Sequence, residues 1–191
     1  MFYFSALNIS ALMQKFDFEL LDFFHSPVHG GSGIFICGKK GRHSPNASVQ
    51  DTLEKERTAF KENKIFHDFK VKIESNKIKA TALIHEEKRQ GQVVGAYGAP
   101  AKAFTVFSYY ELDDSSIAFC IDTTPTKIGK VFPKFNIPIL SEEALNELEY
   151  NTVLINAWNY KEDILKKASL IFKKGTKLIF LIPDLEIHIV K

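Results

Sequence analysis

A short stretch of small residues near the middle of the chain has the composition of an anion-binding loop. The stretch Val94-Gly-Ala-Tyr-Gly-Ala-Pro-Ala-Lys102 starts as an apolar strand, turns through small residues and leads into a helix. Backbone N–H groups of such a loop and of the helix N-terminus attract anions. Lys102 in the first helical turn can add a charge-assisted bond to a phosphate, worth about 1.5–3 kcal/mol. The structural alternative is that Gly98 only lets the strand turn, because the full G-x-G-x-x-G pattern is absent.

Two further polar positions follow apolar strands. Asp122 lies about twenty residues beyond the loop, where doubly wound nucleotide-binding folds place an acid that accepts from a ribose hydroxyl. Trp158 and Asn159 follow the apolar segment 152–156, and ligands of open parallel sheets bind beyond such strand ends. Trp158 can stack on a base while Asn159 forms hydrogen bonds. The structural alternatives are an ordinary Asp at a strand end, a core tryptophan and an asparagine that caps the next helix.

The remaining candidates carry less chemistry. In Ser26-Pro-Val-His-Gly-Gly-Ser32, His29 and Ser32 either line a cleft or belong to a tight connection between two strands. No Ser/His/Asp, Cys/His or paired-carboxylate arrangement stands out, so no catalytic residue is assigned. The two cysteines, Cys37 and Cys120, lie in apolar runs and are expected to be buried strand thiols. The six histidines lack ligand spacing, so no metal site is expected.

The elements that must position these residues fall into three regions. Residues 1–40 predict a helix over 10–16 and strands over 18–24 and 33–38, too little for an independent core. Residues 41–90 are charged and predict helices over 47–63 and 67–89, interpreted as solvated packing helices, with partner binding as the alternative. Residues 91–191 alternate strands with helices, which predicts an α/β fold with a parallel sheet covered on both faces. The strands are expected at 92–97, 117–121, 137–140, 152–156 and 177–182, and the helices at 102–110, 141–148 (capped by Ser141) and 160–174.

Composition narrows the function classes. The chain has 191 residues, 45% of them hydrophobic and 25% charged, which suits one globular domain with part of another. The net charge of +2, with acidic and basic residues interspersed, argues against a nucleic-acid partner. No apolar run approaches the roughly 20 residues that cross a membrane, and no signal peptide is expected. With reduced thiols, these features indicate a cytoplasmic protein without a membrane partner.

Taken together, these segments resemble one known family. Residues 94–102 are similar to the G-Y-G-A-P-A-K signature of the C-terminal domain of sugar C-methyltransferases, which methylate a carbon of a nucleotide-activated keto-deoxysugar. Further resemblances follow in order: Asp122–Lys127 to the family's D-x-x-P-x-K, Gly129–Leu140 to its G-x-x-x-P…I-P-I-L, Trp158-Asn159 to its W-N, and Ile182-Pro183 to its I-P. Phe4-Ser5 and Val28–Ser32 resemble the last helix and closing strand pair of its methyltransferase domain.

The resemblance implies a domain organisation and a set of binding residues. Residues 91–191 would form a Rossmann-like domain that holds the nucleotide part of a dTDP-sugar. Residues 41–90 would be a helical connector, and residues 1–40 the remnant of a class I methyltransferase domain. The implied substrate-binding residues are Tyr97, Gly98, Ala99, Pro100, Ala101, Lys102, Asp122, Lys127, Trp158, Asn159, His29 and Ser32.

Departures from the family pattern limit what the chain can be expected to do. The family's zinc-binding segment, Gly-rich cofactor loop and Y-H-E-H motif have no counterpart in the sequence. The resemblance therefore implies that S-adenosylmethionine serves the complete enzyme but is not bound by this chain, which alone is expected to be inactive. Ile34 stands where the family usually has Arg, and Phe104 and Ser108 where it tends to have Asn, so substrate contacts are expected to differ in detail.

Three functional hypotheses remain open. The first is a sugar-nucleotide-binding portion of a C-methyltransferase, whose methyltransferase half is on another chain, on a neighbouring reading frame, or lost. The second is a non-catalytic nucleotide-binding or scaffold module. The third, an oxidoreductase with a dinucleotide at the Gly98 loop, is disfavoured by the incomplete glycine pattern. An orphaned remnant would expose apolar residues around Phe2, Phe4, Leu12 and Leu20, which predicts self-association.

Overall fold

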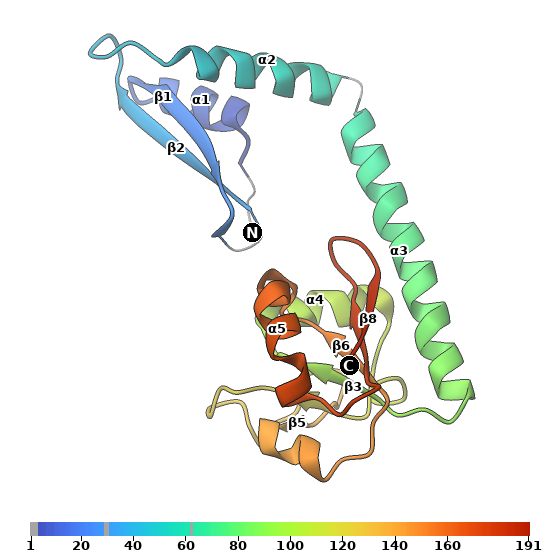
Figure 1. The fold of residues 1–191 in the computed structure, drawn as a ribbon. Helices are drawn as coiled ribbons and strands as arrows, with labels where there is room; N and C mark the ends of the chain where they lie inside the picture. Colours follow the sequence, from blue (N-terminus) through green and yellow to red (C-terminus); the bar gives the residue numbers. More distant parts are fainter. Residues whose placement is uncertain (1–3, 29–30, 62) are drawn as a thin grey trace. The chain divides into compact units, whose positions relative to one another are not determined.

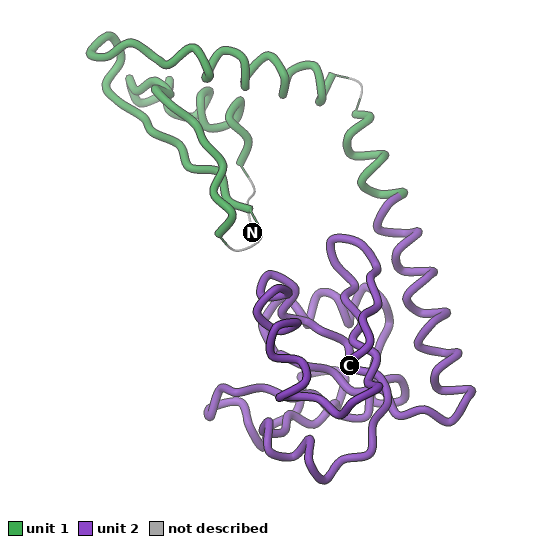
Figure 2. Tube along the Cα trace, viewed as in Figure 1, with its two compact units in different colours: residues 1–71 green, residues 72–191 purple. Residues whose placement is uncertain are grey.

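The computed structural model describes residues 4–28, 31–61 and 63–191. The chain divides into two compact units, residues 1–71 and 72–191 (Figure 2). The boundary falls inside a long helix, so residues 41–90, expected as one connector, are shared between the two units.

The N-terminal unit is a hairpin with helices on one side. It contains α1 (Ala6–Gln14), β1 (Phe18–Ser26), β2 (Ser32–Lys39) and α2 (Ala47–Lys61), followed by the start of α3 (Lys64–Arg89). The strands β1 and β2 pair in antiparallel fashion, as Figure 1 shows. Helix α1 begins four residues before the expected Ser10, because the Ser5 hydroxyl caps it by accepting from the Asn8 N–H at 3.2 Å.

The core of this unit is small. Its buried apolar residues are Ala6, Leu20, Val49 and Leu53. The expected exposure of Leu20 is therefore wrong, because α1 and α2 cover that face of the hairpin. Phe4 and Leu12 are exposed as expected, whereas Phe2 lies outside the described residues. Cys37 is half-buried rather than buried, because it lies at the margin of this small cluster.

The second unit is built on a six-stranded sheet with the order β5-β4-β3-β6-β7-β8. The first five strands are parallel and β8 runs antiparallel to β7. This is the strand order of doubly wound nucleotide-binding folds, so the predicted α/β class is confirmed. The strands are β3 (Val94–Tyr97), β4 (Cys120–Ile121), β5 (Ile139–Leu140), β6 (Thr152–Ile155), β7 (Lys177–Phe180) and β8 (Glu186–Ile189).

Apolar side chains alternate between two buried faces of the sheet. On β6, Leu154 joins a cluster with α4 (Ala101–Tyr110) and the C-terminal half of α3, whereas Val153 and Ile155 join a cluster with α5 (Lys161–Ile171). Both faces are therefore covered, as the continuous apolar strands predicted. Among the described residues, no helix combines the length and apolarity needed to cross a membrane.

Three local expectations need correction. The segment after Ser141 is a short 3-10 helix, η2 (Glu142–Asn146), and the Ser141 side chain does not cap it. Asn159 does not cap α5, because a 3-10 turn, η3 (Trp158–Tyr160), precedes that helix and Tyr160 takes the capping position. The strands β4 and β5 are shorter than expected, because the chain pairs over two residues in each.

Candidate functional site

The loop after β3 lies at the point where the chain reverses its direction across the sheet. β3 pairs with β4 on one side and with β6 on the other, and the connections from β3 and β6 run to opposite edges. Ligands of such sheets bind beyond the carboxyl ends of these two central strands. Gly98 follows β3 and Asn156 follows β6, and the Asn156 N–H donates to the Tyr97 carbonyl at 2.9 Å.

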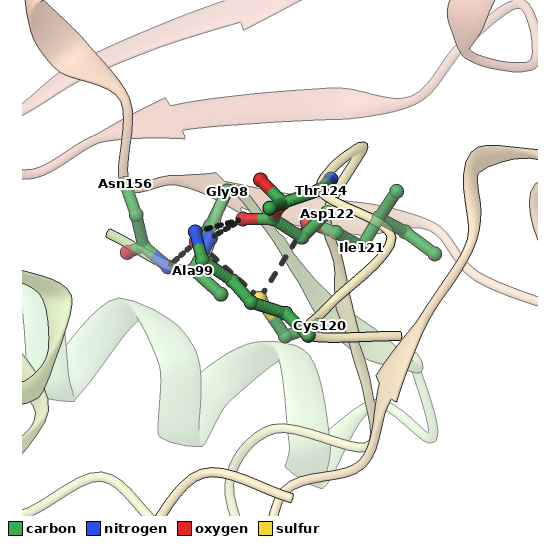
Figure 3. Close-up of polar contacts among 8 residues, drawn as sticks. Gly98, Ala99, Cys120, Ile121, Asp122, Thr124 and Asn156 are labelled. Atoms are coloured by element: carbon green, nitrogen blue, oxygen red, sulfur yellow. Dashed lines mark hydrogen bonds and ion pairs between the residues drawn. The ribbon is translucent and has the colours of Figure 1, made fainter. Parts of the chain in front are cut away.

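Gly98 is required by both conformation and space. Its φ of +90° lies in the region that disfavours side chains, and an added Cβ would stand 3.3 Å from the Ala157 Cβ. Its N–H donates to the Ile121 carbonyl at 2.7 Å. Its carbonyl accepts from the Asn156 amide at 2.8 Å and from the Cys120 thiol at 3.4 Å (Figure 3). Hydrogen bonds with three residues, Ile121, Asn156 and Cys120, therefore fix the loop in the absence of a ligand.

Asp122 holds the loop from the end of β4. Its Oδ2 accepts from the Ala99 N–H at 2.6 Å, and its Oδ1 accepts from the Thr124 N–H at 2.8 Å. The Lys127 ammonium lies 3.2 Å from Oδ2. Burial would raise the pKa of this carboxyl, but the hydrogen bonds from Thr124, Ala99 and Lys127 outweigh it and lower the pKa below its usual value. Asp122 is thus a buried carboxylate that stays ionised.

Lys102 is held between two residues from the loop after β6. Its Nζ donates to the Asn159 Oδ1 at 2.5 Å and lies 3.9 Å from the centre of the Trp158 ring. Partial burial lowers the pKa of the Lys102 ammonium. The cation covers one face of the indole, where base stacking was one hypothesis. The first turn of α4 therefore presents an oriented ammonium to the region beyond the carboxyl ends of β3 and β6, which we call the crevice.

The helix end beside Lys102 is open to a ligand. Pro100 takes the capping position of α4 and offers no side-chain hydrogen bond to the first turn. The N-terminal N–H groups of a helix carry partial positive charge and favour anions. On the other side of the crevice, the Tyr97 hydroxyl donates to Glu142 at 2.8 Å, and burial followed by this carboxylate raises the pKa of Tyr97.

The structure brings most of the predicted site residues together and separates two of them. Ser32 lies in the N-terminal unit, where its hydroxyl donates to the Val28 carbonyl at 2.9 Å. His29 lies outside the described residues. The residues that meet at the switch point are Tyr97, Gly98, Ala99, Pro100, Ala101, Lys102, Asp122, Lys127, Trp158 and Asn159.

Sequence reasoning missed four participants. Asn156 was noticed as a strand end but not as a partner of Gly98, although a polar residue directly after an apolar strand is a usable signal. Cys120 and Glu142 gave no such signal, because their roles depend on which strands become neighbours. The bond of Thr124 is local, since its N–H donates to Asp122 two residues earlier, and an Asp at a turn is a usable signal for it.

The arrangement is suited to binding an anion. The crevice presents the Lys102 ammonium, the N-terminus of α4 and the Asn159 amide, together with a Lys127 ammonium that is paired with the Asp122 carboxylate. No group of three or more His, Cys, Asp and Glu side chains within residues 4–28, 31–61 and 63–191 is placed to hold a metal ion.

Comparison with known proteins adds two findings. The family model described as the C-methyltransferase C-terminal domain matches residues 27–183. The chain is also 29% identical over 184 residues to the C-methyltransferase NovU of Streptomyces niveus. That alignment covers 95% of the present chain but 44% of the relative, so the chain spans less than half of the relative's length. The crevice residues all lie within the matched region.

Proposed function

The chain belongs to the C-methyltransferase C-terminal domain family, and from this premise we propose that its crevice binds the nucleotide part of a dTDP-activated keto-deoxysugar. The observation that carries the proposal is the Lys102 ammonium, fixed by Trp158 and Asn159 beside the open end of α4. A diphosphate supplies the negative charge that this arrangement lacks. The crevice also lies where doubly wound sheets bind nucleotides.

Each part of the ligand has a suitable neighbour. The diphosphate would meet the first turn of α4 and Lys102, with Lys127 adding positive charge from the other side of Asp122. The base would approach the segment of Trp158 and Asn159, whose amide nitrogen remains able to donate when its oxygen accepts from Lys102. The keto sugar would extend away from the crevice toward the methyl donor.

In a complete enzyme the proposed reaction is C-methyl transfer. S-adenosylmethionine supplies the methyl group when it is bound. The crevice residues do not fit this cofactor, because the Lys102 ammonium repels a sulfonium and the Asp122 carboxylate is already paired with Lys127. We therefore place the cofactor outside the described crevice and assign this chain the role of holding the nucleotide.

The hairpin of the N-terminal unit supports the proposal of a methyltransferase half as partner. Phe24, Ile34 and Ile36 are exposed on β1 and β2, although a two-stranded sheet is marginal without cover on its apolar surface. Self-association through the same surface is the competing interpretation. Sedimentation of the chain across a range of concentrations separates the two, since a stable monomer contradicts self-association.

Calorimetric titration tests the nucleotide proposal. Wild type should bind dTDP and not S-adenosylmethionine. Lys102→Ala should weaken dTDP binding about 10- to 100-fold, the value of a lost charge-assisted bond. Lys167→Ala is the matched control, because Lys167 is exposed on α5 and its removal changes the net charge equally. Absence of dTDP binding by wild type would contradict the proposal and favour a scaffold module without ligand.

A further inference from the structure

The hydrogen bonds of Asp122 are the starting point. An ionised carboxylate has about four acceptor positions. The N–H groups of Ala99 and Thr124 and the ammonium of Lys127 fill three of them, and the side chain is 8% exposed. In doubly wound nucleotide-binding folds, an acid at this place accepts from the ribose hydroxyls. Here the carboxylate is turned into the loop (Figure 3).

We propose that Asp122 is a positioning residue. It fixes the loop at Ala99 and holds Lys127 near the diphosphate, and it does not form a hydrogen bond with the ribose. The inference rests on the proposed function, because it concerns the same crevice. It also states a specificity: the crevice takes nucleoside diphosphates with or without a 2′-hydroxyl, since the group that would recognise that hydroxyl is already occupied.

The loop N–H groups lead to the same conclusion. The Gly98 N–H donates to Ile121 and the Ala99 N–H donates to Asp122, so neither is free for a phosphate. The phosphate contacts consequently fall to the first turn of α4 and to Lys102. A buried negative charge next to this anion site is tolerable because Lys127 lies 3.2 Å from it. Asp122 thus fixes the conformation of the loop, and the lysines supply the positive charge that attracts the diphosphate.

Three probes separate positioning from ribose recognition. These are UDP, dUDP and inorganic pyrophosphate, titrated calorimetrically into the full chain. Wild type should bind UDP and dUDP within about threefold of each other. Asp122→Asn should weaken binding of all three probes by one common factor of about 2–10, the cost of ordering a loosened loop on binding. Weaker binding of UDP, alone or together with dUDP, with unchanged pyrophosphate binding would identify Asp122 as a ribose-binding residue and overturn the inference.

A matched variant and a spectroscopic signal complete the test. Asp113 accepts from the N–H two residues later, Ser115, at 3.0 Å, as Asp122 does from Thr124, but Asp113 has no bond to the loop. Asp113→Asn should leave all three affinities unchanged. In nitrogen–proton correlation spectra, the Ala99 amide proton should move upfield in Asp122→Asn and stay in place in Asp113→Asn. An unmoved Ala99 amide would overturn the inference.

Two outcomes need separate interpretation. If wild type binds none of the three probes, the proposed function fails, whereas the Ala99 amide still decides whether Asp122 holds the loop. If Asp122→Asn does not fold, Lys127→Met takes its place, because it keeps both backbone bonds of Asp122. Lys127→Met should weaken all three probes by a common factor. An effect confined to UDP and dUDP would again overturn the inference.

Discussion

The two units of the chain differ in how completely their strands are covered. In the sheet unit, residues 72–191, the central strands alternate apolar side chains between two buried clusters, and helices close both faces. In the N-terminal unit, α1 and α2 cover one face of the hairpin, whereas Ile34 and Ile36 remain 40% and 45% exposed. The sheet unit therefore buries its own apolar strands on both faces. The N-terminal unit leaves apolar strand residues exposed that a partner or another copy of the chain would cover.

The comparison with the family places its boundary inside the hairpin. The family model begins at residue 27, so it includes β2 (Ser32–Lys39) but not β1 (Phe18–Ser26). The two strands nevertheless pair along their whole length. A sequence-defined domain therefore divides the hairpin, whereas the boundary between the two compact units divides α3. Of the pieces that these boundaries define, the sheet unit has a sheet whose central strands are buried on both faces.

The largest expected effect comes from separating the units. A chain of residues 64–191 keeps all of α3 and should fold cooperatively, with a dispersed amide spectrum. A chain of residues 1–63 should remain largely unfolded, because four buried apolar side chains among its described residues cannot offset the conformational entropy of ordering it. Circular dichroism and amide spectra of both fragments provide the measurement. A cooperative thermal transition in residues 1–63 would show that this fragment folds by itself and would contradict the difference in stability between the units.

Two leucine substitutions, one in each unit, should affect different parts of the chain. Leu154→Ala, at the centre of the sheet, should lower the free energy of unfolding of the sheet unit by about 3 kcal/mol through lost burial and a cavity. Leu20→Ala in the hairpin should leave that transition unchanged within about 0.5 kcal/mol. Its effect should instead appear as faster amide exchange in β1 and β2. A loss of sheet-unit stability in Leu20→Ala would show that the units unfold as one.

The sequence predicted strands correctly where apolar residues follow one another along the strand. All the apolar strands of the parallel sheet were predicted, because each forms a run that both faces bury. The strand β8 was missed, because Glu186, His188 and their neighbours alternate between half-buried and exposed at an edge, without an apolar run. Leu20 was assigned to the wrong environment, because nothing local to it indicates that α2, about thirty residues later, covers it.

The candidate site was predictable in position but not in the role of each residue. Strand ends and small residues placed the crevice at Gly98, Asp122 and Trp158 from the sequence. Which partner each group takes depends on the strand order. Asp122 reaches Ala99 because β3 and β4 are neighbours, and Lys102 reaches Asn159 because β3 and β6 are neighbours. Such cross-strand contacts have no local signal in the sequence.

A smaller effect concerns how the last turns of α3 are attached to the sheet. Glu87 is buried, and its carboxylate accepts from the Thr152 hydroxyl at 2.7 Å and from the Lys177 ammonium at 2.6 Å. Glu87→Gln should lower the free energy of unfolding by about 1–2 kcal/mol, because the half-exposed Lys177 can turn to water. Glu86→Gln is the neighbouring control. It removes an exposed pair with Arg89 and should change stability by about 0.5 kcal/mol or less. Equal effects in chemical denaturation would contradict the buried attachment.

Acid should affect the sheet unit through the same carboxylate, as the smallest of these effects. Burial would raise the pKa of Glu87, but the bonds from Lys177 and Thr152 outweigh it and hold that pKa below its ordinary value. In the unfolded chain a glutamate titrates near a pKa of about 4.3. The unfolded state therefore binds a proton first, and stability is fully present above pH of about 4.3 and falls as pH drops through the lowered pKa. Denaturation midpoints measured between neutral and acidic pH should decline less steeply in Glu87→Gln than in wild type. If the midpoints of wild type and Glu87→Gln declined equally with pH, Glu87 would have the same pKa in the folded and unfolded chains. The contact that joins α3 to β6 and β7 would then contribute no pH-dependent stability.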